Sequence, residues 1–192
     1  MEHTYMGNAG VFLVTMVFGF ILLMMMLRFF LHWVQADFYN PVSQFIASVT
    51  TPLIRPLQSF MPTIYGMDLA TLAMALALQM LELILIFLLS DYALNLPAIF
   101  FIALSKLLQL SINIFFFAIL IQAIFSWISP ASWNPVTIMI HQLCEPVLRP
   151  AKRLLPPMNG LDLSPILVLV ALQLAEILII APLSDLGRGT LL

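Results

Sequence analysis

PLIRPLQSFMPTIYGMDLATLAMALALQMLEL, at residues 52–83, is matched 94 positions later by PVLRPAKRLLPPMNGLDLSPILVLVALQLAEI, at residues 146–177. The same offset holds without a gap between residues 33–86 and residues 127–180. Two unrelated apolar helices would match leucine and isoleucine by chance, but they would not align an arginine between prolines, a Gly-x-Asp and a Gln-x-x-Glu. The chain is therefore predicted to be a tandem duplication.

The matched positions are polar residues, glycines and prolines, which are more informative than aliphatic ones. They pair Asn40-Pro41 with Asn134-Pro135, Pro62 with Pro156, Gly66 with Gly160, Asp68 with Asp162, Gln79 with Gln173, and Glu82 with Glu176. We therefore expect two domains of the same plan, a first copy at residues 1–94 and a second copy at residues 95–192.

The composition places this chain in lipid. Hydrophobic residues make up 62% of the 192 residues, charged residues make up 8%, and the mean hydropathy is +1.08. A bilayer core needs roughly 20 apolar residues per helix. Four stretches meet that length, at residues 9–31, 69–89, 97–127 and 163–183. The fold class predicted is an all-α integral membrane protein with four transmembrane helices.

Each copy is expected to contain a membrane helix, an Asn-Pro turn, an interfacial segment, a glycine turn and a second membrane helix. An even number of spans per copy makes the two repeats parallel. The interfacial segments are predicted to be amphipathic helices in the headgroup plane. In the first copy the apolar face would hold Val42, Phe45, Ile46 and Val49, with Ser43, Gln44 and Ser48 facing away. In the second copy it would hold Met139, Ile140, Leu143 and Val147.

The residues that end one segment and begin the next agree with this plan. Gly66 and Gly160 allow a chain reversal, and Asp68 and Asp162 follow them at the start of the next helix. An aspartate in that place accepts hydrogen bonds from open backbone amides. We expect both aspartates to be helix N-caps.

Basic residues are unevenly distributed and predict the orientation. Arg55 lies in the first interfacial segment, and Arg149, Lys152 and Arg153 lie in the second. The positive-inside rule puts both segments in the cytoplasm and both termini outside. Arg188, near the carboxyl terminus, counts slightly against this orientation.

The paired motifs resemble those of the YggT (YlmG-like) family of bacterial inner-membrane proteins. The similarity includes DFYNPVSQF at residues 37–45 and the run from Glu145 to Pro165, and it extends over nearly the whole chain. The resemblance implies a multi-pass protein of the bacterial inner membrane. Bacterial members of that family are linked to osmotic stress and potassium retention, and plastid and cyanobacterial members to division, nucleoid distribution and cytochrome assembly. The resemblance implies no catalytic residues.

The sharpest chemical feature is the Gln-x-x-Glu pair of each second membrane helix, Gln79 with Glu82 and Gln173 with Glu176. Ionisable groups in a membrane are costly and usually face a bundle interior or a water-filled cavity. They could form an ion or proton path, or they could hold the bundle together by interhelical hydrogen bonds. Interhelical packing is the more common role of such groups.

Lys106 is the expected partner of Glu82. It lies roughly 13 Å inside its helix when counted from Pro97, which is near the depth of Glu82. The offset equivalent of Lys106 in the first copy is Phe12, so Glu176 has no corresponding cation. That asymmetry is the main hint of a role beyond scaffolding.

Arg55 and Arg149 each lie inside a P-x-x-R-P run. The prolines are expected to make a stiff turn that holds each arginine in a defined place. At the headgroup level the arginine would bind lipid phosphate or cap a neighbouring helix end. Both readings remain open.

Catalysis, metal binding and nucleic-acid binding have little support. His141 and Cys144 could share a helical face, but a third group is missing, and the single cysteine excludes an intrachain disulfide. No cofactor or metal is expected, and no basic stripe follows a phosphate backbone. The leading hypothesis is a non-enzymatic membrane scaffold, assembly or osmotic-stress factor, with lipid, other membrane proteins or a second copy as partners. The alternative is a small ion transporter or channel.

Overall fold

The computed structural model describes residues 2–36, 40–64, 66–90, 94–128, 134–154 and 162–189. Four of its helices are long and apolar enough to cross a membrane. They are α1 (Glu2–Trp33), α3 (Leu69–Leu89), α4 (Leu96–Ile128), and a fourth helix made of α6 (Ser164–Ala175), the π-helix η1 (Glu176–Ile180) and α7 (Ala181–Gly189). The prediction of an all-helical chain with four apolar helices is confirmed.

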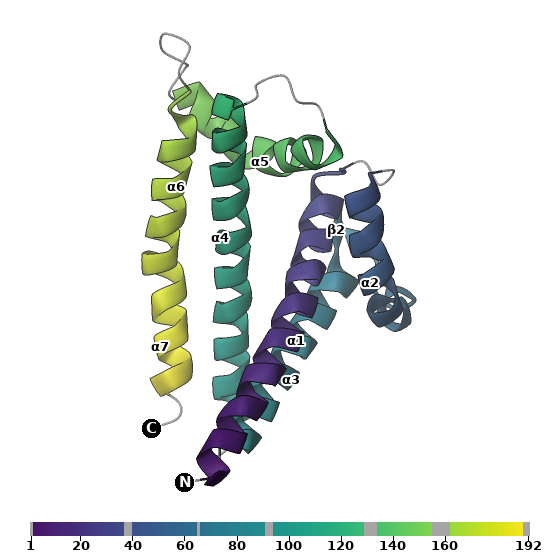
Figure 1. Cartoon of the computed structure of the whole chain (residues 1–192), viewed down its shortest axis with the longest axis vertical. Helices are drawn as coiled ribbons and strands as arrows, with labels where there is room; N and C mark the ends of the chain where they lie inside the picture. Colours follow the sequence, from purple (N-terminus) through teal and green to yellow (C-terminus); the bar gives the residue numbers. More distant parts are fainter. Residues whose placement is uncertain are drawn as a thin grey trace.

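Helix α4 lies between the other three long helices. In Figure 1, α1 and α3 lie on one side of α4, and the helix formed by α6, η1 and α7 lies on the other. Helix α1 packs against α3, α3 packs against α4, and α4 packs against α7. The beginning of α1 and the end of α7 lie at the same end of the molecule. The first and last described helices therefore have their outer ends on one side of the molecule (Figure 1).

The two shorter helices, α2 (Pro41–Gln58) and α5 (Pro135–Leu154), follow the two Asn-Pro pairs. The Asn40 side chain accepts a hydrogen bond from the Val42 amide at 2.9 Å, and the Asn134 side chain accepts from Thr137 at 2.9 Å. An N-cap asparagine followed by proline in the first turn is a strong helix start. The Asn40 amide also donates to the Pro135 carbonyl, which ties the two helix starts together.

The P-x-x-R-P runs are not turns, so that prediction is wrong. Pro52 and Pro56 lie inside α2, and Pro146 and Pro150 lie inside α5. A proline removes one helical hydrogen bond and crowds the preceding turn. All four prolines are exposed, so they lie on the faces of α2 and α5 that point away from the rest of the chain.

Helix α2 buries a different face from the one predicted. Ser43 and Thr50 are buried together with Ile46 and Ile54, whereas Phe45 is exposed. The two helices also run differently, since α5 crosses the end of the bundle while α2 runs beside α1 (Figure 1). Thr50 on the buried face of α2 meets an arginine of α1, described below. In α5 the predicted apolar residues Met139, Ile140 and Leu143 are buried.

A small hairpin that the sequence did not predict precedes α3. Strands β1 (Thr63–Ile64) and β2 (Met67–Asp68) pair antiparallel, and Gly66 has a φ of 78°. A positive φ is strained for residues with a side chain, so the turn requires glycine there. Its offset equivalent, Gly160, lies outside the described residues.

The aspartates that follow the glycines begin their helices in two different ways. Asp68 is the N-cap of α3 and accepts from the Thr71 amide at 3.2 Å. Asp162 lies one residue before the N-cap of α6 and accepts from the Ser164 amide at 2.9 Å. The offset equivalent of Thr71 is Pro165, which has no amide hydrogen. The aspartate of the second copy must therefore use an earlier donor.

The π-helix η1 is explained by Pro182. The Ala181 amide donates to the Glu176 carbonyl, five residues earlier. Pro182 cannot donate to the carbonyl four residues before it and would clash with that group in a regular α-helix. Widening the preceding turn relieves the clash. The offset equivalent of Pro182 is Leu88, and α3 continues as an α-helix through that position.

Candidate functional site

A polar pair with a buried carboxylate connects α3 to α4. Lys106 Nζ lies 3.7 Å from Glu82 Oε1, and the Gln79 amide donates to Glu82 Oε2 at 2.5 Å. The Glu82 side chain is 4% exposed, whereas that of Lys106 is 43% exposed. The carboxylate is thus compensated on both oxygens, and the pairing expected from helix depth is present.

Glu176 and Gln173 form the corresponding pair on the opposite side of α4. The Gln173 amide donates to Glu176 Oε2 at 3.2 Å, but Gln173 is exposed and Glu176 is only half-buried. Helix α3 lies on one side of α4 and the fourth helix lies on the other (Figure 1). The structure therefore brings Lys106 to Glu82 but does not gather the two glutamates into one site.

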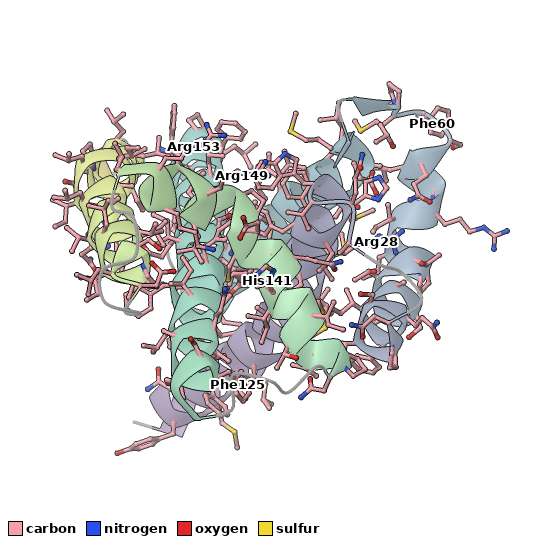
Figure 2. All side chains as sticks on the ribbon, turned by 90° about the horizontal axis from the view of Figure 1, so that it is seen from above. Arg28, Phe60, Phe125, His141, Arg149 and Arg153 are labelled. Atoms are coloured by element: carbon pink, nitrogen blue, oxygen red, sulfur yellow. The ribbon has the colours of Figure 1, made fainter. Side chains whose placement is uncertain are left out.

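Arg28, which sequence analysis missed, is the centre of a second polar cluster. Its guanidinium donates through Nη1 to Thr50 Oγ1 at 3.0 Å and to Thr51 Oγ1 at 2.9 Å. A weaker contact at 3.5 Å reaches the Ala47 carbonyl. Figure 2 places Arg28 between the ribbons of α1 and α2. The arginine thus holds α2 against α1.

Asp68 completes this cluster from the start of α3. Asp68 as a whole is 6% exposed, its carboxylate accepts from the Thr71 hydroxyl at 2.7 Å, and its negative charge favours the charged form of Arg28. A buried carboxylate is tolerated where nearby donors and a cation compensate it. Helices α1, α2 and α3 therefore meet at a polar junction and not only at an apolar one.

One sequence signal could have identified Arg28. It is the only charged residue between positions 9 and 31, in the first predicted span. Its offset equivalent is Gln122, whose buried Oε1 has no partner among the described residues. The two copies therefore differ at this position, with an arginine in the first copy and a glutamine in the second.

Cys144 is the offset equivalent of Thr50 and lies in an apolar setting. It is fully buried on α5, and this burial raises the pKa of its thiol to about 12, although the charge of Lys152 acts in the opposite direction. A thiol with a raised pKa stays protonated at neutral pH and is a poor nucleophile. His141, three residues earlier, is exposed. This arrangement does not support a catalytic pair.

The basic residues lie on the outer faces of the short helices. Arg55 on α2 and Arg149 on α5 are exposed, next to the fully buried Ile54 and the nearly buried Leu148. Lys152 Nζ lies 3.1 Å from Glu145 Oε2 on the same helix. Arg149 and Arg153 lie along the half of α5 that is nearest α6 (Figure 2). The exposed guanidinium groups are available to ligands or partners.

Comparison with known proteins identifies the family. A family model described as CCB3/YggT matches the chain twice, at residues 7–89 and 101–183. An uncharacterized protein of Pseudomonas aeruginosa is 39% identical over 91% of this chain and 90% of its own length. An uncharacterized Vibrio alginolyticus protein is 37% identical over 89% of this chain and 93% of its own.

A third relative carries the family name. The uncharacterized protein YggT of Escherichia coli K12 is 36% identical over 86% of each chain. No solved structure matches the chain. The family model matches most of the sequence, and the relatives match it over nearly their full lengths. The chain therefore belongs to the CCB3/YggT family.

Proposed function

We propose that this chain is a non-enzymatic factor of the bacterial inner membrane that binds anionic lipid and membrane-protein partners through α2 and α5. The observation that carries the proposal is the pair of exposed arginines, Arg55 and Arg149, on helices whose opposite faces are buried in the protein. A guanidinium group binds phosphate oxygens with paired hydrogen bonds. Helix α5 would lie at the headgroup level, and α2 would extend from that level along the side of α1 (Figure 1).

The attachment of α2 supports a docking role. Arg28 fixes α2 to α1 through two threonine hydroxyls, and Asn40 ties its start to α5. A binding surface that is already held in place loses less conformational entropy when a ligand binds. The two helices would thus act as one prepared surface.

The proposed orientation places this surface in the cytoplasm. Arg55, Arg149, Lys152 and Arg153 all lie on α2 and α5, and the positive-inside rule assigns them to the cytoplasmic side. Both termini would then lie outside. The anionic lipids of that leaflet attract basic groups near the surface.

The lipid part of this proposal is tested by counting retained phospholipids. Wild-type protein and an Arg55→Gln/Arg149→Gln variant are extracted from membranes containing phosphatidylglycerol, and bound lipids are counted by native mass spectrometry. We expect the variant to retain less anionic lipid, by about fivefold per arginine removed. Arg188→Gln, which changes an exposed arginine at the other end of the molecule, is the matched control. Equal retention in all three proteins would refute lipid binding at this surface.

We propose in addition that this docking surface supports osmotic tolerance, which is tested in cells that lack their own family member. Reversal of charge in Arg55→Glu/Arg149→Glu is expected to abolish growth after a hyperosmotic shift, because the docking surface would repel phosphate and acidic partners. Arg188→Glu is expected to support growth. Normal growth of the double variant at wild-type protein level would contradict the docking role.

A second candidate, an ion transporter, rests on the charged groups inside the apolar helices. Lys106 and Glu82 place a cation and an anion in contact within two predicted spans. Against this candidate, Glu82 is already compensated, and Glu176 lies on the other side of α4. Ion flux into liposomes separates the two functions, with Glu82→Gln/Glu176→Gln as the variant. Flux that this variant loses would establish transport, and flux no greater than in empty liposomes would exclude it.

A further inference from the structure

The contact between α3 and α4 is also the contact between the two copies of the repeat. Leu83 of α3 and Ile99 of α4 belong to one buried cluster, next to the pair formed by Glu82 and Lys106. Leu83 is 4% exposed and Ile99 is completely buried. Within one chain, the second membrane helix of the first copy is therefore covered by the first membrane helix of the next copy.

The same face in the second copy is uncovered. Ile177, which stands where Leu83 stands in the first copy, is 57% exposed. Three further apolar equivalents of this contact, Val170, Leu174 and Leu178, are each more than half exposed. Gln173 and Glu176 lie among them. Apolar side chains need only lipid as a neighbour, but an amide and a carboxylate on a lipid-facing surface are costly.

Helix α1 presents the complementary uncovered face. Tyr5 is the offset equivalent of Ile99 and is 73% exposed, and Leu13 is the equivalent of the buried Leu107 and is 61% exposed. Phe12, which replaces Lys106, is exposed on the same face. Both halves of the internal contact thus recur on this chain as bare surfaces.

We infer that a second copy of this chain packs its α1 against the face formed by α6 and η1, which repeats the contact between α3 and α4 from chain to chain. The helices that carry the two faces lie on opposite sides of α4 (Figure 1), which suits a head-to-tail contact. Repeated from chain to chain, such a contact forms a closed ring when the rotation between neighbouring chains adds up to a full turn. Asn8, one helical turn before Phe12 and exposed, brings an amide donor for Glu176 in place of the missing lysine. This contact uses only spanning helices, so it does not depend on lipid binding at α2 and α5.

Disulfide cross-linking between differently tagged copies tests the arrangement. The buried Cys144 is first replaced by alanine. One tagged copy then carries Tyr5→Cys and the other carries Ile177→Cys, which reproduces between chains the neighbouring pair Ile99 and Leu83. Oxidation in membranes is expected to join the two tags.

The matched control replaces Tyr5→Cys by Phe100→Cys. Phe100 is exposed on α4 and is the neighbour of Ile99, so it lies at a similar depth but on another face. A cross-link with Tyr5→Cys that is several times stronger than the control supports the inferred contact. Equal cross-linking in both pairs, or none in either, would overturn it.

A charge design gives a second readout that needs no cysteine. Phe12→Lys rebuilds the pair of Glu82 and Lys106 between chains, so we expect self-association to tighten by about tenfold. Adding Glu176→Gln to that variant removes the partner and should cancel the gain. Association constants are measured by single-molecule photobleaching in liposomes. A gain that persists without Glu176, or no gain at all, would show that Phe12 does not meet Glu176 of a second copy.

Discussion

Lys106 Nζ and Glu82 Oε1 are 3.7 Å apart, and this ion pair links α3 to α4 at the junction between the two copies. The two partners are unequal, because the carboxylate is buried while the lysine side chain reaches the surface. A buried charge that loses its partner is more costly than an exposed one. The stability of this junction is therefore expected to depend on which partner is removed.

Lys106→Met is predicted to destabilise the protein more than Glu82→Gln does. The first change leaves Glu82 buried without its cation and is expected to cost about 2 kcal/mol. The second keeps an amide beside Gln79 and leaves a lysine that can extend to the surface. Thermal unfolding in detergent measures both. If Lys106→Met unfolds at the wild-type temperature, the pair does not stabilise the junction. If it unfolds at a lower temperature, the double variant Glu82→Gln/Lys106→Met should recover part of the loss.

Arg28→Met is predicted to release α2 from α1. The change removes charge-assisted hydrogen bonds to Thr50 and Thr51, so backbone amides of α2 should exchange hydrogen about tenfold faster. Hydrogen exchange followed by mass spectrometry over residues 46–54 measures this. Arg55→Met, on the exposed face of the same helix, is the control. Unchanged exchange in Arg28→Met would show that apolar packing alone holds α2.

Gly187→Ala is predicted to push α7 away from α4. A Cβ atom at Gly187 would lie 2.8 Å from Ile102 Cγ1 and 3.3 Å from the Ala98 carbonyl oxygen. Overpacking of this kind costs about 1–3 kcal/mol. Gly19→Ala is a matched change, since a Cβ atom there meets nothing within 4 Å. A lower unfolding temperature for the first variant alone is expected, and equal temperatures would contradict the close approach.

Cys144 is predicted to resist maleimide at neutral pH. Burial raises the pKa of its thiol to about 12 from an ordinary 9.0, so little thiolate is present in the folded state. Because the folded state holds this proton more tightly, its stabilising contribution is complete below pH 9 and declines between about pH 9 and 12. Labelling rates and unfolding temperatures across that range measure both effects, with Cys144→Ala as the control for stability. Rapid labelling at pH 7 without unfolding would contradict this prediction.

Features governed by local chemistry could be predicted from the sequence. The four apolar stretches, the Asn-Pro helix starts and the Asp68 cap depend on neighbouring residues and on length, so patterns expose them. The pairing of Lys106 with Glu82 followed from equal depth in two adjacent helices. Depth along a helix is set by residue count, which the sequence contains.

Features set by tertiary contacts could not be predicted. Thr50 faces the protein because Arg28 lies opposite it, and no local pattern in α2 reveals that arginine. The P-x-x-R-P runs remain helical because packing against the rest of the chain outweighs the loss of backbone hydrogen bonds. Gln173 is exposed and Glu176 only half-buried because their helix lies on the far side of α4, which the repeat could not show.

The wide turn that Pro182 imposes on η1 changes the phase of everything that follows it. A π-turn contains one extra residue, so later side chains are rotated by roughly 100° relative to an uninterrupted α-helix. The repeat in the sequence is clear up to Ile180, where the wide turn ends. Before that residue, the fourth helix keeps the side-chain order of α3. Beyond it, the rotation turns Gly187 of α7 toward α4. A single proline has thus changed which residues of one duplicated helix face its partner within the copy, without altering the part that the two helices share.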